Sequence, residues 1–148
     1  MKHKLLFKIA VIVFGACCLA LIRFYETSLF YDPLIDFYNG RFHLKPFPEL
    51  KFWAYNLNLT FRYLLNTLVS IGIIWYLFKN KTYIKFSVLI YIAVFIIGLI
   101  TFWIIAHNIQ SKDFMLLFYI RRFLIQPILV IVLIPAFYFQ KLNKKGHK

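Results

Sequence analysis

An uncharged apolar run of 21 residues, 86–106, constrains the fold of this chain more than any other feature of its sequence. An α-helix needs about 20 mostly apolar residues to cross the hydrocarbon core of a bilayer. Backbone groups in lipid have to be hydrogen-bonded within the segment, and the run lacks the alternation of a barrel strand. The run therefore predicts a transmembrane helix.

Three further stretches predict membrane spans. The four predicted spans cover approximately residues 5–22, 62–78, 86–106 and 114–139. The chain is 62% hydrophobic and 16% charged, whereas soluble domains are about 45–50% apolar and about 25% charged. This composition excludes a soluble enzyme and a disulfide scaffold. We expect residues 1–148 to form one all-α integral membrane domain with four transmembrane helices.

Basic residues are unevenly distributed around these spans, which predicts the topology. Ten lysines flank one side: Lys2, Lys4, Lys8, Lys79, Lys81, Lys85, Lys141, Lys144, Lys145 and Lys148. The opposite side has six basic residues and all five acids, Glu26, Asp32, Asp36, Glu49 and Asp113. Short cytoplasmic segments carry the excess of Lys and Arg. We therefore expect both termini in the cytoplasm and the loop 23–61 outside. The net charge of +13 then reflects topology, and we expect no nucleic-acid partner.

The first predicted span has a rival interpretation. A basic start followed by an apolar run is also typical of a signal peptide, and residues 14–17 are close to a bacterial lipobox whose Cys17 would be lipidated. Phe14 stands where a lipobox usually has Leu, and apolar residues continue past the cysteine as far as Ile22. We expect an uncleaved helix, with the lipoprotein as the alternative.

The outer loop 23–61 is rich in aromatic residues, which a free solvated loop would not be. Turn signals occur at residues 32–33 and 39–40. The pattern predicts short amphipathic pieces around Pro33–Tyr38 and Glu49–Leu57. Two interpretations remain open: an interfacial lid over the helix ends, or a docking face for another membrane protein.

Polar residues inside the predicted spans are the candidate functional residues, because they are costly in lipid. Asn66 and Ser70 follow Arg62 at intervals of four, which places the three on one helix face. The candidate partner- or anion-binding residues are Arg23, Arg62, Asn66, Arg121, Arg122 and Gln126. Guanidinium groups suit carboxylates and phosphates. The arginines could equally pair with lipid phosphates or with the chain's own acids, so these alternatives stay open.

Two prolines interrupt the fourth predicted span. Pro127 and Pro135 are expected to kink or soften this helix, because proline lacks an N–H group. The side chain of Gln126 is expected to satisfy the carbonyl freed at Pro127.

The adjacent cysteines Cys17 and Cys18 raise the possibility of an intramembrane thiol enzyme. His107 could supply a base, and Arg121 or Arg122 an oxyanion partner. Buried cysteines are also common as small apolar residues, and the four histidines show no metal-ligand spacing. We therefore assign no catalytic residue, metal or cofactor.

Several segments together resemble a known family. They are residues 61–67 (FRYLLNT), residues 85–91 (KFSVLIY) and above all residues 119–127 (YIRRFLIQP), followed by residues 135–138 (PAFY). The chain resembles the exosortase F system-associated membrane proteins of Bacteroidota over nearly its full length. The Arg-Arg-Phe…Gln-Pro stretch is the most specific part of this resemblance.

The resemblance implies a companion of an exosortase, a multi-pass membrane cysteine transpeptidase that processes sorting signals of exported proteins. No catalytic residue carries over. The expected function is therefore a non-enzymatic accessory or scaffold subunit in the bacterial inner membrane, with the transpeptidase and membrane lipids as partners. The alternatives are a thiol enzyme using Cys17 or Cys18, and a binder or carrier of a lipid or small anion.

Overall fold

The computed structural model describes residues 2–146, and every regular element within that range is a helix. Lys148, one of the lysines counted above, lies outside the described residues, as do the side chains of residues 2–5, 43 and 144–146. In chain order the elements are α1 (Lys2–Phe24), α2 (Glu26–Leu29), α3 (Pro33–Tyr38), η1 (Phe42–Leu44), α4 (Phe52–Phe78), α5 (Lys81–His107), η2 (Ser111–Asp113), α6 (Phe114–Ile125) and α7 (Ile128–Gly146). The all-α class expected from the sequence is confirmed.

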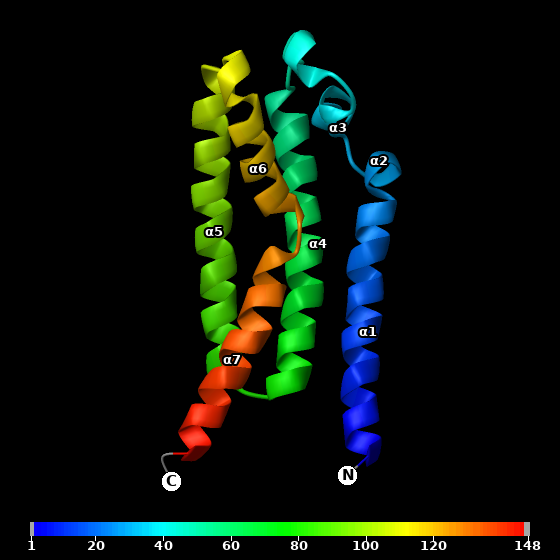
Figure 1. Cartoon of the computed structure of the whole chain (residues 1–148), viewed down its shortest axis with the longest axis vertical. Coiled ribbons are helices and arrows are strands. Elements are labelled where there is room, and N and C mark those ends of the chain that lie inside the picture. The colour runs from blue at the N-terminus through cyan, green and yellow to red at the C-terminus, as the bar shows by residue number, and fades with distance from the viewer. Residues whose placement is uncertain (1, 147–148) are drawn as a thin grey trace.

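Three helices, α1, α4 and α5, are each long and apolar enough to cross a membrane. The segments Ser111–Ile125 and Ile128–Asn143 pass the same test only as a pair, with a bend of 59° between them. The described chain therefore has three candidate spans, or four if the bent pair counts as one. The first residues of α1 and the last residues of α7 lie at the same end of the bundle (Figure 1).

Helix α4 begins at Phe52, ten residues before the start expected from hydropathy. Polar residues such as Asn56 and Asn58 lower the hydropathy of residues 52–61, but they do not stop a helix. No proline or glycine occurs between Pro48 and Gly72, so nothing in the sequence ends the helix there. The connection between the first two long helices is therefore shorter than the predicted loop 23–61.

The break between α6 and α7 occurs at Gln126 and Pro127. Gln126 adopts an extended conformation, with φ −97° and ψ 143°, as residues before proline usually do. Pro127 has no N–H group to continue the hydrogen bonds of α6. The predicted kink at Pro127 is thus a full break, whereas Pro135 lies inside α7 without ending it.

Helix α1 stands on one side of α4, while α5 stands on the other side (Figure 1). Gly15 is buried where α1 meets α4, because a Cβ atom there would collide with the side chain of Ile73. The glycine therefore permits the close approach of the two helices. Most of the remaining apolar surface of α1 is exposed.

The segment 25–51 folds over one end of the bundle, which we call the loop end (Figure 1). Helix α3 spans Pro33–Tyr38, as predicted, and buries Leu34 and Phe37. The ring of Phe37 contacts that of Phe114 in an edge-to-face arrangement, with centroids 5.2 Å apart. The Tyr38 hydroxyl donates a hydrogen bond of 2.8 Å to the Phe114 carbonyl. These contacts attach the segment to α6.

Candidate functional site

Two arginines are buried at the loop end of the bundle. Arg62, on α4, is 2% exposed, and Arg121, on α6, is 5% exposed. Their partners are carboxylates from the segment that folds over this end: Glu26 begins α2, and Asp32 precedes α3. We call these four residues the ion-pair cluster.

Asp32 uses both carboxylate oxygens. Its Oδ1 accepts a hydrogen bond of 3.2 Å from the Leu34 N–H, which caps the start of α3. Its Oδ2 accepts hydrogen bonds from Arg121 Nη2 at 2.5 Å and from Arg121 Nε at 3.2 Å, and lies 3.8 Å from Arg62 Nη1. One side chain therefore joins α3 to both α4 and α6.

Glu26 forms the second half of the cluster. Its Oε2 accepts a hydrogen bond from Arg62 Nη2 and lies 3.4 Å from Arg23 Nη1. The Arg23 side chain is 53% exposed, so its pair with Glu26 contributes little to stability compared with a buried pair. The buried pairs link the segment 25–51 to α4 and α6 by charge as well as by packing.

The polar face predicted for α4 is confirmed, since Arg62, Asn66 and Ser70 are all buried. Ser70 Oγ donates to the Asn66 carbonyl at 2.6 Å. Asn66 Nδ2 donates to the Ile125 carbonyl at 3.0 Å, at the end of α6. Asn66 therefore satisfies a carbonyl at the helix break.

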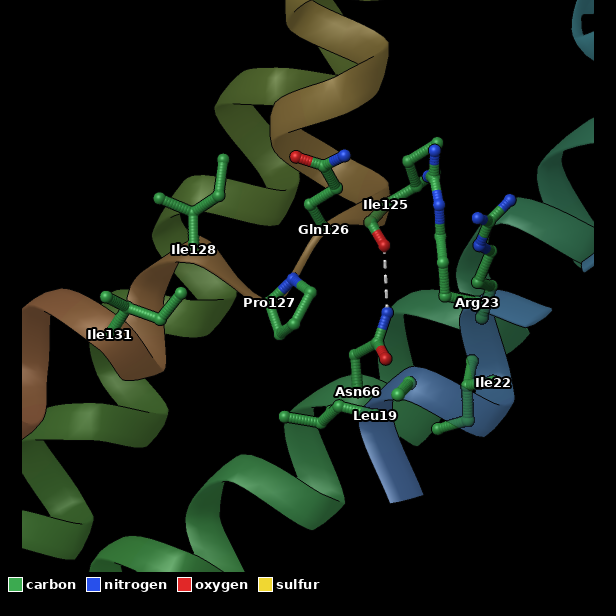
Figure 2. A pocket seen from close by; sticks show the side chains of 11 residues that line it. Leu19, Ile22, Arg23, Asn66, Ile125, Gln126, Pro127, Ile128 and Ile131 are labelled. Atoms are coloured by element: carbon green, nitrogen blue, oxygen red, sulfur yellow. Dashed lines mark hydrogen bonds between the residues drawn. The ribbon is translucent and has the colours of Figure 1, made fainter. Parts of the chain in front are cut away.

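The role expected for Gln126 was wrong. Its side chain does not bond the carbonyl at the break; instead its Oε1 accepts a hydrogen bond of 3.1 Å from Arg122 Nε. The break directs the Ile125 carbonyl toward α4, where Asn66 lies, while the side chain of Gln126 points away from Asn66 (Figure 2). A partner from another helix could not be read from spacing within the fourth span.

The structure divides the six predicted site residues into two groups. Arg62, Arg121 and Asn66 are buried, whereas Arg23 and Arg122 are exposed and Gln126 is half-buried. The Arg122 guanidinium lies 6.0 Å from the centre of the Phe118 ring, outside the ion-pair cluster.

Four of the six predicted residues line one hollow of about 280 Å³ between α1, α4 and the break before α7. Figure 2 shows α1 residues on one side of this hollow and α7 residues on the other. The lining includes Arg23, Arg62, Asn66, Gln126, Leu19, Ile22, Pro127, Ile128 and Ile131. Arg121 and Arg122 are not part of the lining.

The residues of the thiol-enzyme alternative are spread over the fold. Cys17 is exposed and Cys18 half-buried on α1, whereas His107 ends α5, on the far side of α4 (Figure 1). Within the described residues, His, Cys, Asp and Glu form no group of three or more that could hold a metal ion.

Sequence reasoning named Glu26 and Asp32 only as possible partners of the arginines and not as site residues. Asp32-Pro33 was recognised as a turn signal, but an acid followed by proline is also a signal for a helix N-cap. The sequence gives no indication that the second carboxylate oxygen reaches two arginines, since those lie on distant helices.

Tyr38 lies beside this cluster on α3. Burial raises its pKa to about 12 from the ordinary value of 10, and the nearby Arg121 guanidinium opposes this shift. The phenol therefore keeps its proton, and its hydrogen bond to the Phe114 carbonyl, over the physiological range.

Comparison with models of protein families, with curated proteins and with solved structures finds no match to this chain.

Proposed function

We propose that this chain is a non-enzymatic accessory or scaffold subunit of an exosortase-type protein-sorting system. In this proposal it lies in the bacterial inner membrane with four spans, counting the bent pair as one. Both termini face the cytoplasm and the loop end faces outward. The uneven distribution of lysines supports this orientation.

The observation that carries the proposal is the two-faced character of the segment 25–51. One face is buried on the bundle through Phe30, Leu34 and Phe37. The other displays Tyr25 and Leu29, which are 51% and 61% exposed, beyond the end of the first candidate span. Exposed apolar residues next to one another, on a segment attached to the bundle by ion pairs, suit a surface that binds another protein. We call Tyr25, Leu29 and the exposed Tyr31 the docking face.

The ion-pair cluster supports a scaffolding role for this end of the molecule. Arg62 and Arg121 are each paired with one of this chain's own carboxylates, Glu26 and Asp32. Buried ion pairs fix the position of the elements that they join. The cluster would thus hold the docking face in one orientation toward a partner.

The chemical class of the partner, a membrane cysteine transpeptidase, comes from the sequence resemblance. Arg122 suits a contact with it, because its side chain is exposed and, unlike that of Arg23, is not paired with Glu26. Arg121→Ala would disturb Asp32 and so lower the amount of folded protein. Arg122→Gln therefore tests a partner contact without breaking the cluster.

The proposal can be tested in cells that express the tagged chain at its natural level. A photo-crosslinking amino acid in place of Leu29 is expected to capture a multi-pass transpeptidase, identified by mass spectrometry after mild-detergent purification. The matched control places the same amino acid at Phe139, which lies inside α7 and is 65% exposed. Arg122→Gln is expected to reduce capture at normal protein level.

The docking face would be contradicted if the crosslinking amino acid at Leu29 captured no protein. It would also be contradicted if the substitutions at Leu29 and Phe139 captured the same proteins. Capture of a partner with no transpeptidase character would retain a scaffold and reject the exosortase assignment.

A further inference from the structure

The hollow between α1 and α7 combines a polar rim with an apolar wall. Arg23, Asn66 and Gln126 contribute polar groups near the helix break (Figure 2). The apolar wall is formed from the two flanking helices by Leu19, Ile22, Ile128 and Ile131. In Figure 2, Leu19 and Ile131 lie farther along the hollow than the polar ends of Arg23 and Gln126. The hollow therefore matches an amphipathic molecule with its polar group at the loop end.

Buried polar atoms beside the hollow have no hydrogen-bond partner within the described chain. They are Oδ1 of Asn66, which is 5% exposed, and Nε and Nη1 of Arg62. The Asn66 amide is held in place because its Nδ2 is bonded to the Ile125 carbonyl (Figure 2). Buried polar groups are almost always paired. The two side chains thus offer fixed donors and one fixed acceptor to a ligand.

The charges around the hollow favour an anion. Within residues 2–146, the guanidinium groups of Arg23, Arg62 and Arg121 are paired with only two carboxylates, Glu26 and Asp32. This set of five side chains has one positive charge in excess. A ligand with a single negative charge would neutralise it, and such compensation matters most where water is scarce.

The start of α7 adds to the same preference. Pro127 and Ile128 line the hollow, so the first turn of a 19-residue helix begins at its edge. The N-terminus of a helix carries partial positive charge and unpaired N–H groups. In broken membrane helices, such half-helix starts commonly face anionic groups.

We propose that this hollow binds the headgroup of an anionic phospholipid, with the phosphate between Arg23, Arg62 and the start of α7. One acyl chain lies along the apolar wall formed by Leu19, Ile22 and Ile131. A hydroxyl of the headgroup donates to Asn66 Oδ1. A free phosphate would satisfy the rim and leave the apolar wall without a partner, so the shape favours a lipid. The inference is independent of the docking face, because the purified chain alone is sufficient to test it.

The test uses native mass spectrometry of the full chain in mild detergent. Three probes separate the contribution of the phosphate from that of the acyl chains. They are dioleoyl-phosphatidylglycerol, the matching diacylglycerol without phosphate, and inorganic phosphate. Phosphatidylglycerol is expected to bind at least about tenfold more tightly than diacylglycerol, which is about 1.4 kcal/mol. Inorganic phosphate is expected not to displace it. Equal binding of diacylglycerol, or displacement by phosphate alone, would overturn the proposal.

Variants then place the site in the hollow. Arg23→Gln and Gln126→Leu are each expected to weaken phosphatidylglycerol binding about tenfold, while leaving the buried pairs of the cluster intact. Arg41→Gln removes the same charge from an exposed position outside the hollow and is expected to bind as the original chain does. An equal loss in Arg41→Gln would show non-specific attraction and overturn the assignment. If these lipid-binding predictions fail, the crosslinking result at Leu29 is unaffected.

Discussion

Both ends of the bundle contain packed aromatic rings, and the loop end adds buried ion pairs to them. At the loop end, two buried arginines meet two carboxylates. At the opposite end, which carries both described chain ends, aromatic rings pack on one another: the centroids of Phe78, Tyr83 and Phe137 lie 4.7–5.7 Å apart. The first arrangement is directional, whereas the second mainly fills space.

This difference determines how strongly each end can fix the arrangement of the helices. Lipid chains are as apolar as aromatic and aliphatic side chains, so apolar packing between membrane helices gains little from excluding water. An ion pair, by contrast, requires each helix to present its charge at one level. Arg121 meets Asp32 only when α3 sits against α6. We therefore infer that the loop end fixes the arrangement of the helices, and we expect single substitutions to cost more there.

The largest effects are expected from substitutions of Asp32, beginning with Asp32→Asn. Asparagine keeps the helix cap of α3 but removes the charge that neutralises Arg121. Leaving a buried charge without its partner costs about 3–5 kcal/mol. Asp32→Ala should lose about 1 kcal/mol more, because the cap is lost as well. Chemical unfolding in detergent micelles, followed by circular dichroism, measures both.

Asp36→Asn provides the control for this comparison, since Asp36 lies on the same helix α3 but is exposed. The free energy of unfolding of the Asp36→Asn variant should differ from that of the original chain by no more than about 0.5 kcal/mol. Equal effects of Asp32→Asn and Asp36→Asn would mean that the cluster does not stabilise the loop end.

A smaller effect is expected at the opposite end from Phe137→Ala. The Phe137 ring contacts those of Phe78, Tyr83 and Phe86. In a soluble core such a truncation costs about 3–5 kcal/mol. Within lipid the transfer contribution largely disappears and the lost packing remains, so we expect about 1–3 kcal/mol. The same unfolding measurement applies.

Phe139→Ala is the matched control, because Phe139 lies on the same helix and is 65% exposed. A loss for Phe137→Ala as large as that for Asp32→Asn would contradict the distinction between the two ends. It would mean that aromatic packing specifies the fold as strongly as the ion pairs.

Hydropathy alone was sufficient to predict the helical class and most of the long helices, because uninterrupted apolar runs leave the backbone few alternatives in lipid. It misplaced the start of α4, since it measures lipid preference and not helix continuation through Asn56 and Asn58. The helix α3 was predicted from local signals, with Asp32 and Pro33 at its start. Predictions were therefore best where the signal was local.

The candidate site was predictable in its residue types and not in its pairing. Spacing by four correctly placed Arg62, Asn66 and Ser70 on one buried face. Nothing in a single sequence joins Arg121 to Asp32 across 89 residues, or Asn66 to Ile125 across 59 residues. For the same reason, adjacent Arg121 and Arg122 looked equivalent, although the first is buried and the second exposed. Such pairings depend on how the helices pack.

The smallest expected effect concerns Tyr38, which attaches the loop end to α6. Tyr38→Phe removes the hydrogen bond to the Phe114 carbonyl and should cost about 1 kcal/mol near neutral pH. Burial raises the Tyr38 pKa from 10.0 to about 12, so the folded protein holds this proton more tightly than the unfolded chain does. The stabilising contribution is therefore complete below about pH 10 and is lost as the pH rises toward about 12.

This loss of stability with rising pH can be tested by measuring the unfolding temperatures of the original chain and of Tyr38→Phe. The measurements are made in detergent from about pH 8 to about pH 12. The advantage of the original chain should shrink as the pH rises, because only the original chain has a phenol to ionise at this position. Tyr119→Phe changes an exposed tyrosine on α6 and controls for alkaline effects on the rest of the protein. A constant difference between the original chain and Tyr38→Phe across this range would mean that Tyr38 titrates alike in the folded and unfolded states. The loop end would then admit water around α3, and its ion pairs would lie in a wetter environment than the burial of Arg121 and Asp32 indicates.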